Sequence, residues 1–225
     1  MYKNIMLKIS GESLAGLNEQ GFDFDILNDL SNSIKKLQSK KLKISIVLGG
    51  GNFIRGSSFS NGVVDRVTSD YMGMLGTVIN SLALQSNLKK IGVESRVMTA
   101  ISINRVAEPY IKNKASNHLE KNRVVIFASG TGNPFFSTDT AAVLRASEMK
   151  SDIILKGTKV DGIYNKDPVN YSDAKKISQI SYSDYLNKDI KVMDATAISL
   201  AKDRSLSIII FSILKSSNIL DIVEG

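Results

Sequence analysis

Short apolar runs alternate with segments of helical spacing along this chain. Six runs rich in Ile, Val and Leu are long enough for buried strands, and they lie at residues 4–10, 43–48, 93–99, 123–128, 153–156 and 207–211. Between them, apolar residues at helical spacing predict helices near residues 25–40, 70–91, 138–149 and 195–204. Strands that alternate with helices are typical of an α/β fold with a largely parallel sheet that is covered on both faces.

Polar residues mark where two of these helices begin. Asp23 or Asp25 can cap the helix that ends near residue 40, and Ser137-Thr138-Asp139 has the composition of a second cap. Free N–H groups at a helix start attract anions, so the second cap is a candidate anion site.

Two glycines and one Asp-Gly pair predict further local features. Gly73 and Gly76 interrupt the helix at 70–91, which predicts close packing against another element or subunit, with local loss of helix as the alternative. Asp161-Gly162 predicts a small hairpin within residues 160–164. Residues 101–116 have no clear pattern, and a short helix is expected at 116–121.

Glycine-bearing loops follow four of the predicted strands, after Ile9, Leu48, Ala128 and Lys156. The carboxyl ends of parallel strands lie along one edge of a sheet, and ligands bind there. Successive loop amides form anion sites, to which lysine and arginine add charge. Lys8, Arg55 and Lys156 stand beside these loops, so the sequence predicts a cationic cleft for a polyphosphate. The Gly49-Gly50-Gly51 triplet taken alone fits a tight turn equally well.

Lys8 lies inside an apolar run. A buried charge without a partner is costly, so we expect Lys8 to face a partner at the end of its strand. The alternative is an edge strand that carries this lysine into solvent.

Composition narrows the class of protein. The 225 residues are 43% hydrophobic and 23% charged, values typical of a globular chain, and no linker-like stretch divides them, so we expect a single domain over 1–225. The absence of cysteine excludes disulfides and thiolate chemistry. No secretory signal or membrane-spanning run is evident, which favours a cytoplasmic protein without a membrane partner. The net charge of +7 comes from lysines near predicted helix ends, so nucleic-acid binding is not expected.

The common nucleotide-binding motifs do not occur. A P-loop requires a Gly-Lys pair, and the chain has none. The dinucleotide fingerprint lacks its third glycine at Ile54 and at Phe135. Protein-kinase signatures are also missing. The predicted phosphate site therefore belongs to another class.

Five motifs resemble those of the bacterial UMP kinase (uridylate kinase) family, within the amino acid kinase superfamily. They are Lys8-Ile9-Ser10-Gly11-Glu12, Gly49-Gly50-Gly51-Asn52-Phe53-Ile54-Arg55-Gly56, the segment from Thr131 to Asp139, the segment from Lys156 to Tyr164, and Lys191-Val192-Met193-Asp194. The similarity covers about residues 2–212, and Gly-Asn-Pro-Phe-Phe is its most specific part. The resemblance implies a three-layer αβα sandwich and the reaction ATP + UMP → ADP + UDP, with Mg²⁺ carried by ATP.

The resemblance also implies roles for individual residues. The implied ATP-binding residues are Lys8, Ile9, Ser10, Gly11, Gly51, Arg55, Thr158, Tyr164 and Asp167. The implied UMP-binding residues are Gly50, Asp70, Thr131, Gly132, Asn133, Pro134, Phe135, Phe136, Ser137 and Thr138. The implied catalytic residues are Lys8, Arg55, Lys156 and Asp194, with Asp194 as the carboxylate that orients the lysines. No protein metal ligand is expected.

The residues present suit this chemistry. A phosphomonoester has a second pKa of about 6, so the acceptor is an anionic nucleophile at neutral pH and requires no general base. The single histidine, His118, lies in a polar segment that we expect to be exposed and not catalytic. Phe135 and Phe136 could form an apolar wall for uracil or belong to the core. Asp70 could accept a ribose hydroxyl, cap the long helix, or do both.

Some features depart from the family pattern. Gly157 replaces a common alanine, and residues 18–23 differ in length from common members near a segment linked to GTP activation, which makes such activation doubtful here. The chain stops at Gly225, before the strand that usually closes these proteins. The family's homohexamers imply self-association, with the helix at 70–91 as the candidate dimer contact. The alternative functions are a superfamily kinase with a carboxylate or carbamate acceptor, and a non-catalytic nucleotide-binding protein.

Overall fold

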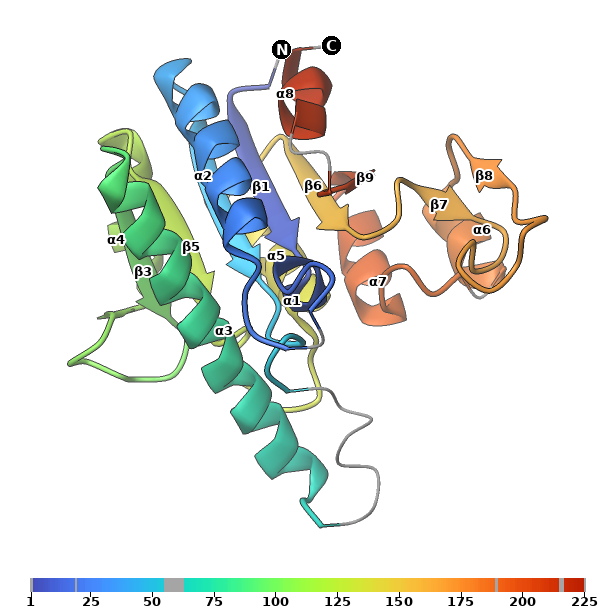
Figure 1. The fold of residues 1–225 in the computed structure, drawn as a ribbon, viewed down its shortest axis with the longest axis horizontal. Helices are drawn as coiled ribbons and strands as arrows, with labels where there is room; N and C mark the ends of the chain where they lie inside the picture. The colour runs from blue at the N-terminus through green and yellow to red at the C-terminus, as the bar shows by residue number, and fades with distance from the viewer. Residues whose placement is uncertain (1, 19, 55–62, 189, 215–216, 225) are drawn as a thin grey trace.

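A seven-stranded parallel sheet forms the centre of the molecule in the computed structural model, which describes residues 2–18, 20–54, 63–188, 190–214 and 217–224 (Figure 1). Its strands are β1 (Asn4–Ile9), β2 (Lys43–Leu48), β3 (Ser95–Thr99), β4 (Glu108–Pro109), β5 (Val124–Ala128), β6 (Ile153–Thr158) and β9 (Ser207–Ser212). They are ordered β4-β3-β5-β2-β1-β6-β9, and every neighbouring pair is parallel. The predicted α/β class is confirmed.

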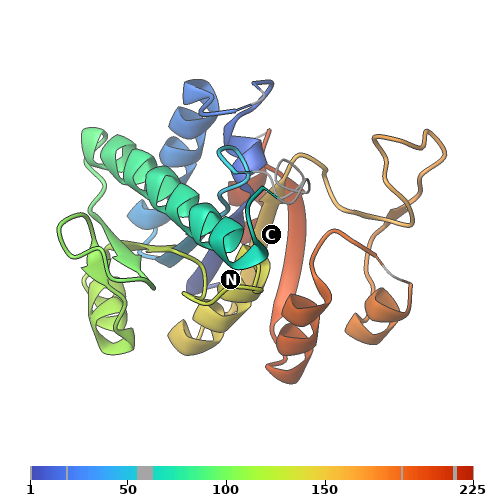
Figure 2. The ribbon, with the colours of Figure 1, turned by 90° about the horizontal axis from the view of Figure 1, so that it is seen from below.

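Helices cover both faces of the sheet, as the view from below shows (Figure 2). One layer contains α2 (Phe24–Ser39), α3 (Arg66–Lys90) and α8 (Ser217–Glu224), and the other contains α4 (Lys112–Glu120), α5 (Thr138–Met149) and α7 (Ala195–Asp203). Because side chains alternate along a strand, Ile5, Leu7 and Ile9 of β1 face the first layer, whereas Met6 faces the second. Lys8 therefore points toward α5. The three-layer αβα arrangement is confirmed.

The predicted caps are present at α2 and α5. The Asp23 carboxylate accepts hydrogen bonds from the amides of Asp25 and Ile26, and the Ser137 hydroxyl accepts from those of Asp139 and Thr140. These bonds satisfy amides that have no partner within the helix. Both helices consequently begin where the sequence predicts.

The long helix α3 begins earlier than expected, because Asp65 caps it. Asp70 therefore lies in its second turn, and the interpretation of Asp70 as a cap is wrong. Helix α4 begins at Lys112 instead of residue 116, and the apolar end of the chain forms α8. The short strand β4 lies in the segment without a sequence pattern, where it extends the sheet edge beside β3.

A small lobe projects from the end of β6 (Figure 1). It contains β7 (Ile163–Tyr164), β8 (Lys176–Ile177) and α6 (Tyr182–Asn187). β7 pairs antiparallel with β8, so the predicted hairpin within residues 160–164 is wrong. The Asp161-Gly162 bend leads into β7, whose partner lies more than ten residues further along the chain. None of the described helices has the length and apolar character needed to cross a bilayer.

Candidate active site

Four neighbouring strands bring the glycine loops together. β5, β2, β1 and β6 are consecutive in the sheet, so the loops after Ala128, Leu48, Ile9 and Lys156 lie along one edge, as predicted. In the β1–β6 pair, Lys8 is directly opposite Lys156. Two lysines of adjacent strands thus leave the sheet on the same face and at the same height.

Asp139 joins the two lysines. Its Oδ1 lies 2.7 Å from Nζ of Lys8, and its Oδ2 lies 2.6 Å from Nζ of Lys156. Both lysine residues are only 5% exposed. Asp139 is the second residue of α5, so the positive end of this helix lies beside the same carboxylate. The expectation that Lys8 faces a partner at the end of its strand is confirmed.

The electrostatics of this triad follow from burial. Burial lowers the pKa of Lys156 to about 8, and the charge of Lys8 acts in the same direction against the attraction of Asp139. Burial alone would raise the pKa of Asp139, but the adjacent Lys8 and Lys156 charges hold it below its ordinary value. Asp139 is therefore a carboxylate at neutral pH, and this single negative charge is paired with the ammonium groups of both Lys8 and Lys156.

Asp194 lies at the start of α7, where its charge favours the protonated form of Lys156. It caps α7 by accepting from the amide of Ala197, and it accepts hydrogen bonds from the hydroxyls of Ser137 and Thr140. Among the described contacts, Asp139, and not Asp194, touches both lysines. Asp194 instead ties the start of α7 to the start of α5. The role of Asp194 as the carboxylate that orients the lysines stays a prediction, and Asp139 is the carboxylate in direct contact with both of them.

Backbone segments approach closely at two glycines of the site. A Cβ on Gly11 would lie 2.5 Å from the amide nitrogen of Gly51, and one on Gly50 would lie 2.5 Å from the carbonyl oxygen of Gly73. Only glycine fits at either position without a backbone shift. A Cβ on Gly76 would lie 3.3 Å from the carbonyl oxygen of Gly50, so the predicted close packing is confirmed at Gly76, whereas the Cβ position of Gly73 is open.

A cavity of about 160 Å³ lies between the loop after β2, the first half of α3 and the loop after β5. Five of the predicted UMP-binding residues line it, namely Gly50, Asp70, Thr131, Phe136 and Thr138. Asp70 accepts a hydrogen bond of 2.7 Å from the amide of Phe135 and pairs with Arg66. The structure thus brings the middle of α3 and the loop after β5 around one space.

The rest of the 131–138 segment forms the turn that connects β5 to α5. Phe135 is 67% exposed and Phe136 is 49% exposed, so the interpretation of these rings as core residues is wrong. Gly132 has a φ of +84°, and the Thr131 hydroxyl accepts from the amide of Asn133. Pro134 lies between Asn133 and Phe135 in the same exposed turn. Ser137 closes the segment as the cap of α5.

The other predicted ATP-binding residues fall into two groups. Ile9 ends β1, and Ser10 caps the short helix α1 (Gly11–Leu14), so both lie next to the lysines. Thr158 ends β6, where the lobe begins. In the lobe, the hydroxyl of Tyr164 donates to Asp161, and Asp167 accepts from the amide of Val169. The predicted adenosine contacts therefore come from a separate part of the molecule.

Two residues singled out by sequence need separate comment. Arg55 lies outside the described residues. His118 is only partly exposed, with Nε2 3.1 Å from a Glu108 carboxylate oxygen and Nδ1 3.3 Å from Arg123. The expectation of an exposed histidine is wrong, and the contacts of His118 lie at the β4 side of the sheet, away from the lysine triad.

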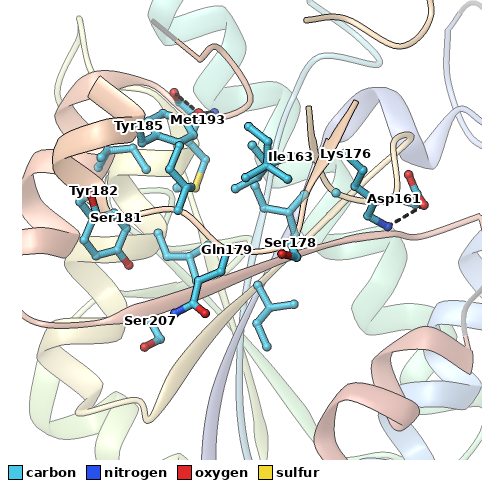
Figure 3. Close-up of a pocket in the computed structure, with 17 residues that line it drawn as sticks. Asp161, Ile163, Lys176, Ser178, Gln179, Ser181, Tyr182, Tyr185, Met193 and Ser207 are labelled. Carbon is cyan, nitrogen blue, oxygen red and sulfur yellow. Dashed lines mark hydrogen bonds and ion pairs between the residues drawn. The ribbon is translucent and has the colours of Figure 1, made fainter. Parts of the chain in front are cut away.

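A larger cavity of about 640 Å³ lies between the lobe and the edge strand β9 (Figure 3). Its walls carry Ile163, Met193 and the isoleucines of β9, with Gln179 and Ser207 among the polar side chains. None of the predicted site residues lines it, and it has few groups suited to phosphate. The side chains suited to binding phosphate lie at the lysine edge of the sheet instead.

The fold and the site together define a class of protein. It is a parallel α/β protein with a phosphate-binding site, formed by lysines and glycine loops, at one edge of its sheet. The family model described as "Amino acid kinase family" matches residues 3–212. The uridylate kinase of Sulfurimonas denitrificans is 52% identical over 224 residues, which cover 99% of this chain and 94% of that protein.

Two solved structures agree with this likeness. The UMP kinase of Ureaplasma parvum superposes with a TM-score of 0.93 at 39% identity, covering 100% of this chain and 95% of that one. The UMP kinase of Bacillus anthracis gives a TM-score of 0.91 at 39% identity, covering 98% and 93%. This chain belongs to the amino acid kinase family, in the group of the uridylate kinases.

Proposed function

We propose that this chain transfers the γ-phosphate of ATP to UMP, giving UDP and ADP, as a nucleoside monophosphate kinase. The observation that carries the proposal is the buried Lys8–Asp139–Lys156 triad. Thr138, the residue before Asp139 in α5, lines the cavity that Asp70 and Thr131 also line. A phosphoryl group that passes from donor to acceptor at this edge would meet both ammonium groups.

The chemistry needs charge relief and alignment more than proton transfer. The UMP phosphate is already dianionic over most of the neutral range, because its second pKa is about 6. Two anions must approach in line, and negative charge on the transferring group must be neutralised. Lys8 and Lys156 supply that neutralisation from fixed positions, while Asp139 keeps the two cations close together. Fixed charges of this kind need no reorganisation during the reaction.

The donor and acceptor sides follow from the positions of the loops. We assign the ATP phosphates to Lys8–Gly11, Gly51 and Arg55, and the adenosine to Thr158, Tyr164 and Asp167. We assign UMP to Gly50, Asp70 and the 131–138 segment. Within this proposal Asp194 is a positioning residue, since it holds the first turn of α5 through Ser137 and Thr140.

We propose that Mg²⁺ enters with ATP. The described residues contain no group of three or more His, Cys, Asp or Glu side chains placed to hold a metal ion, and Asp139 is engaged by two lysines. Such a site suits a metal bound through substrate phosphates, as Mg²⁺ often is. Bound there, the ion would neutralise phosphate charge.

We further propose self-association through α3, leading to a homohexamer. Val67, Tyr71, Leu75 and Ile79 recur at every fourth position and are 38% to 48% exposed, which forms an apolar stripe along one side of this helix. A second copy could cover the stripe. A single domain over residues 1–225, a cytoplasmic location and the absence of a nucleic-acid partner stay predictions, and we do not propose GTP activation.

A coupled assay of ADP formation tests the activity. The chain is supplied with ATP, Mg²⁺ and one acceptor at a time: UMP, CMP, N-acetylglutamate or carbamate. Turnover with UMP well above the other acceptors is expected. Turnover with a carboxylate or carbamate alone would favour the alternative kinase, and nucleotide binding without turnover would favour a non-catalytic binding protein. Lys8→Ala prepared in parallel controls for contaminating kinases.

A further inference from the structure

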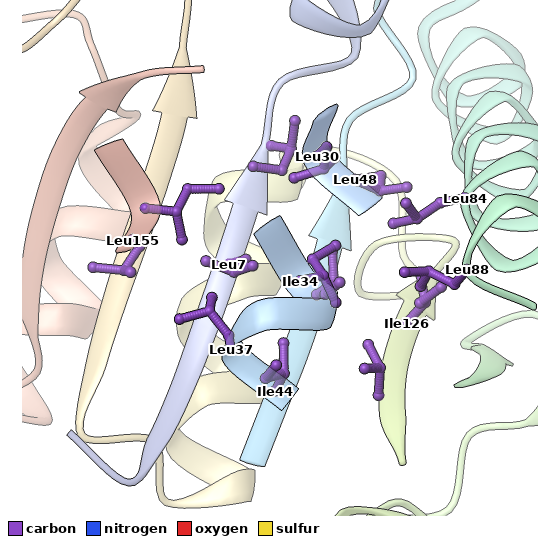
Figure 4. Close-up of a cluster of buried hydrophobic side chains, with 14 of the residues drawn as sticks. Leu7, Leu30, Ile34, Leu37, Ile44, Leu48, Leu84, Leu88, Ile126 and Leu155 are labelled. Carbon is purple, nitrogen blue, oxygen red and sulfur yellow. The ribbon is translucent and has the colours of Figure 1, made fainter. Parts of the chain in front are cut away.

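The buried face of α3 changes character along its length. In the carboxyl half, Leu84 and Leu88 point toward the strands and pack in the apolar core (Figure 4). Near the middle of the helix, where it passes the carboxyl edge of the sheet, Thr77 and Asn80 are also buried, at 2% and 0% exposure, beside the apolar Val78. Buried polar groups are costly unless they are hydrogen-bonded. The hydrogen-bond partners of Thr77 and Asn80 therefore show what these buried polar side chains do at this edge of the sheet.

Asn80 holds the loop after β2. Its Nδ2 donates to the carbonyl oxygen of Gly49 at 2.6 Å and to Oδ1 of Asn52 at 2.7 Å. Asn52 returns a hydrogen bond of 2.9 Å from its own Nδ2 to Oδ1 of Asn80. Asn52 is also fully buried. The two amides therefore clamp both ends of the segment 49–52, which contains Gly50 and Gly51.

Thr77 holds the loop after β5. Its hydroxyl accepts a hydrogen bond of 2.7 Å from the amide of Ser129 and donates to the carbonyl oxygen of Met74. Ser129 has a φ of +64°, an uncommon conformation for a residue with a side chain. The bond from Thr77 stabilises this conformation at the point where the loop leaves the sheet toward Thr131.

We propose that Thr77 and Asn80 are positioning residues, which hold the two glycine loops of the active site at a fixed separation by anchoring both to α3. The side chains are one helical turn apart, and each bonds the backbone of a different loop. This proposal depends on the proposed function, because it concerns the geometry in which UMP and ATP phosphates are bound. Asn80 acts through its loop alone, whereas Thr77 also lines the 160 Å³ cavity and acts through its bond to the amide of Ser129.

A purely structural role predicts a different outcome from a positioning role. If Thr77 and Asn80 only satisfy buried hydrogen-bonding groups, their loss lowers stability and leaves the kinetic constants of the folded enzyme unchanged. If they position the loops, the two losses differ. Thr77 serves the loop that leads into the acceptor segment, so its loss affects UMP. Asn80 serves the loop shared by both substrates, so its loss affects UMP and ATP.

Thr77→Val and Thr77→Ser form the first test. Valine keeps the shape but removes the hydroxyl, whereas serine keeps the hydroxyl. We expect Thr77→Val to raise the KM for UMP about fivefold to tenfold, the size expected for one hydrogen bond, with the KM for ATP within about twofold. Thr77→Ser, which keeps the hydroxyl, should have a KM for UMP close to that of the wild type. Equal kinetic constants for Thr77→Val and wild type would overturn the proposal for this residue.

Asn80→Leu forms the second test, with Leu84→Ala as a control for lost stability in the same helix. Unfolding in urea is measured alongside kinetics below the unfolding transition. We expect Asn80→Leu to lower kcat/KM for both substrates by at least about tenfold, whereas folded Leu84→Ala keeps near wild-type constants. Similar kinetics in both variants would contradict positioning by Asn80. If Asn80→Leu does not fold, Asn52→Ser, which shortens the partner amide, replaces it with the same expected and contradicting results.

The two proposals fail in different ways. Absence of UMP phosphorylation by the wild-type chain overturns the proposed function itself. An active wild type with kinetically silent Thr77→Val and Asn80→Leu variants overturns only the positioning role. Ser81→Ala is the matched neutral variant, because the Ser81 hydroxyl donates only within the helix, to the carbonyl oxygen of Thr77.

Discussion

The lysine edge of the sheet and the projecting lobe contribute to the same proposed substrate site in opposite ways. At the edge, Lys8, Lys156 and Asp139 are buried, and each is held by a strand or helix of the central layers. In the lobe, Tyr164 and Asp167 are held by local hydrogen bonds at the surface. β7 and β8 form only a two-residue pair, separate from the central sheet.

This difference separates two tasks of a phosphoryl-transfer enzyme. Charge stabilisation depends on groups fixed before the reaction starts, because reorganisation during the reaction reduces their effect. Recognition of a distant base can depend on a looser segment, because it contributes equally before and during the reaction. We therefore expect changes at the edge to lower kcat and changes in the lobe to raise the KM for ATP.

The largest effect is expected from Lys8→Ala. This change removes one of the two cations beside the transferring group, and kcat should fall by about a hundredfold to a thousandfold, the size seen when one charge-stabilising donor is lost. Steady-state kinetics with UMP and ATP measure it. Lys35→Ala, on the exposed side of α2, is the control and should keep wild-type kcat. Near-normal turnover of Lys8→Ala would remove this lysine from the mechanism.

Asp139→Asn should rank next. The amide keeps the shape of the carboxylate but leaves Lys8 and Lys156 facing each other without an anion, so we expect kcat to fall by roughly a hundredfold. Asp194→Asn is the matched variant, and its effect should be smaller because Asp194 contacts Ser137 and Thr140 instead of the lysines. A larger loss in Asp194→Asn than in Asp139→Asn would reverse the assignment of the two carboxylates.

The pH dependence of kcat provides a third comparison. Lys156 has a pKa of about 8, lowered chiefly by burial, so it loses its positive charge as the pH rises through that value. If the charged form is the active one, kcat falls above about pH 8 by up to tenfold per pH unit. Removing the attraction of Asp139 lowers the pKa of Lys156 further, so Asp139→Asn should move this fall to lower pH. A flat profile up to pH 10 would show that the charge of Lys156 is not needed.

The smallest effect is expected in the lobe. Asp167→Ala should raise the KM for ATP by about tenfold or less, with kcat and the KM for UMP within about twofold, because a lobe contact would act on binding alone. Asp173→Ala, which removes only a surface ion pair with Lys166, is the control and should leave all constants unchanged. A fall in kcat without a change in KM would contradict the division between edge and lobe.

Sequence patterns predicted the parts of this molecule that depend on local chemistry. All strands of the central sheet except β4, the caps at Asp23 and Ser137, and the presence of a buried partner for Lys8 follow from apolar runs, side-chain hydrogen bonding and the cost of an unpaired charge. The carboxyl ends of the predicted parallel strands placed the glycine loops along one edge.

Features that depend on distant pairing were not predicted. β7 takes its partner from residues 176–177, which no turn signal near Asp161 reveals. Asp139 appeared only in a helix cap and at the end of one family motif, because its contact with both lysines requires β1 and β6 to be neighbours and α5 to pack on them. The buried amides of Asn52 and Asn80 likewise come from segments far apart in the sequence.

A crystal structure with UMP and a non-hydrolysable ATP analogue tests the central claim most directly. We expect Nζ of Lys8 and of Lys156 to lie within about 2.7–3.2 Å of oxygens on the terminal phosphoryl group of the analogue, with the UMP phosphate in line on the side of Gly50 and Asp70. Phosphates bound elsewhere, with both lysines contacting Asp139 alone, would contradict the account.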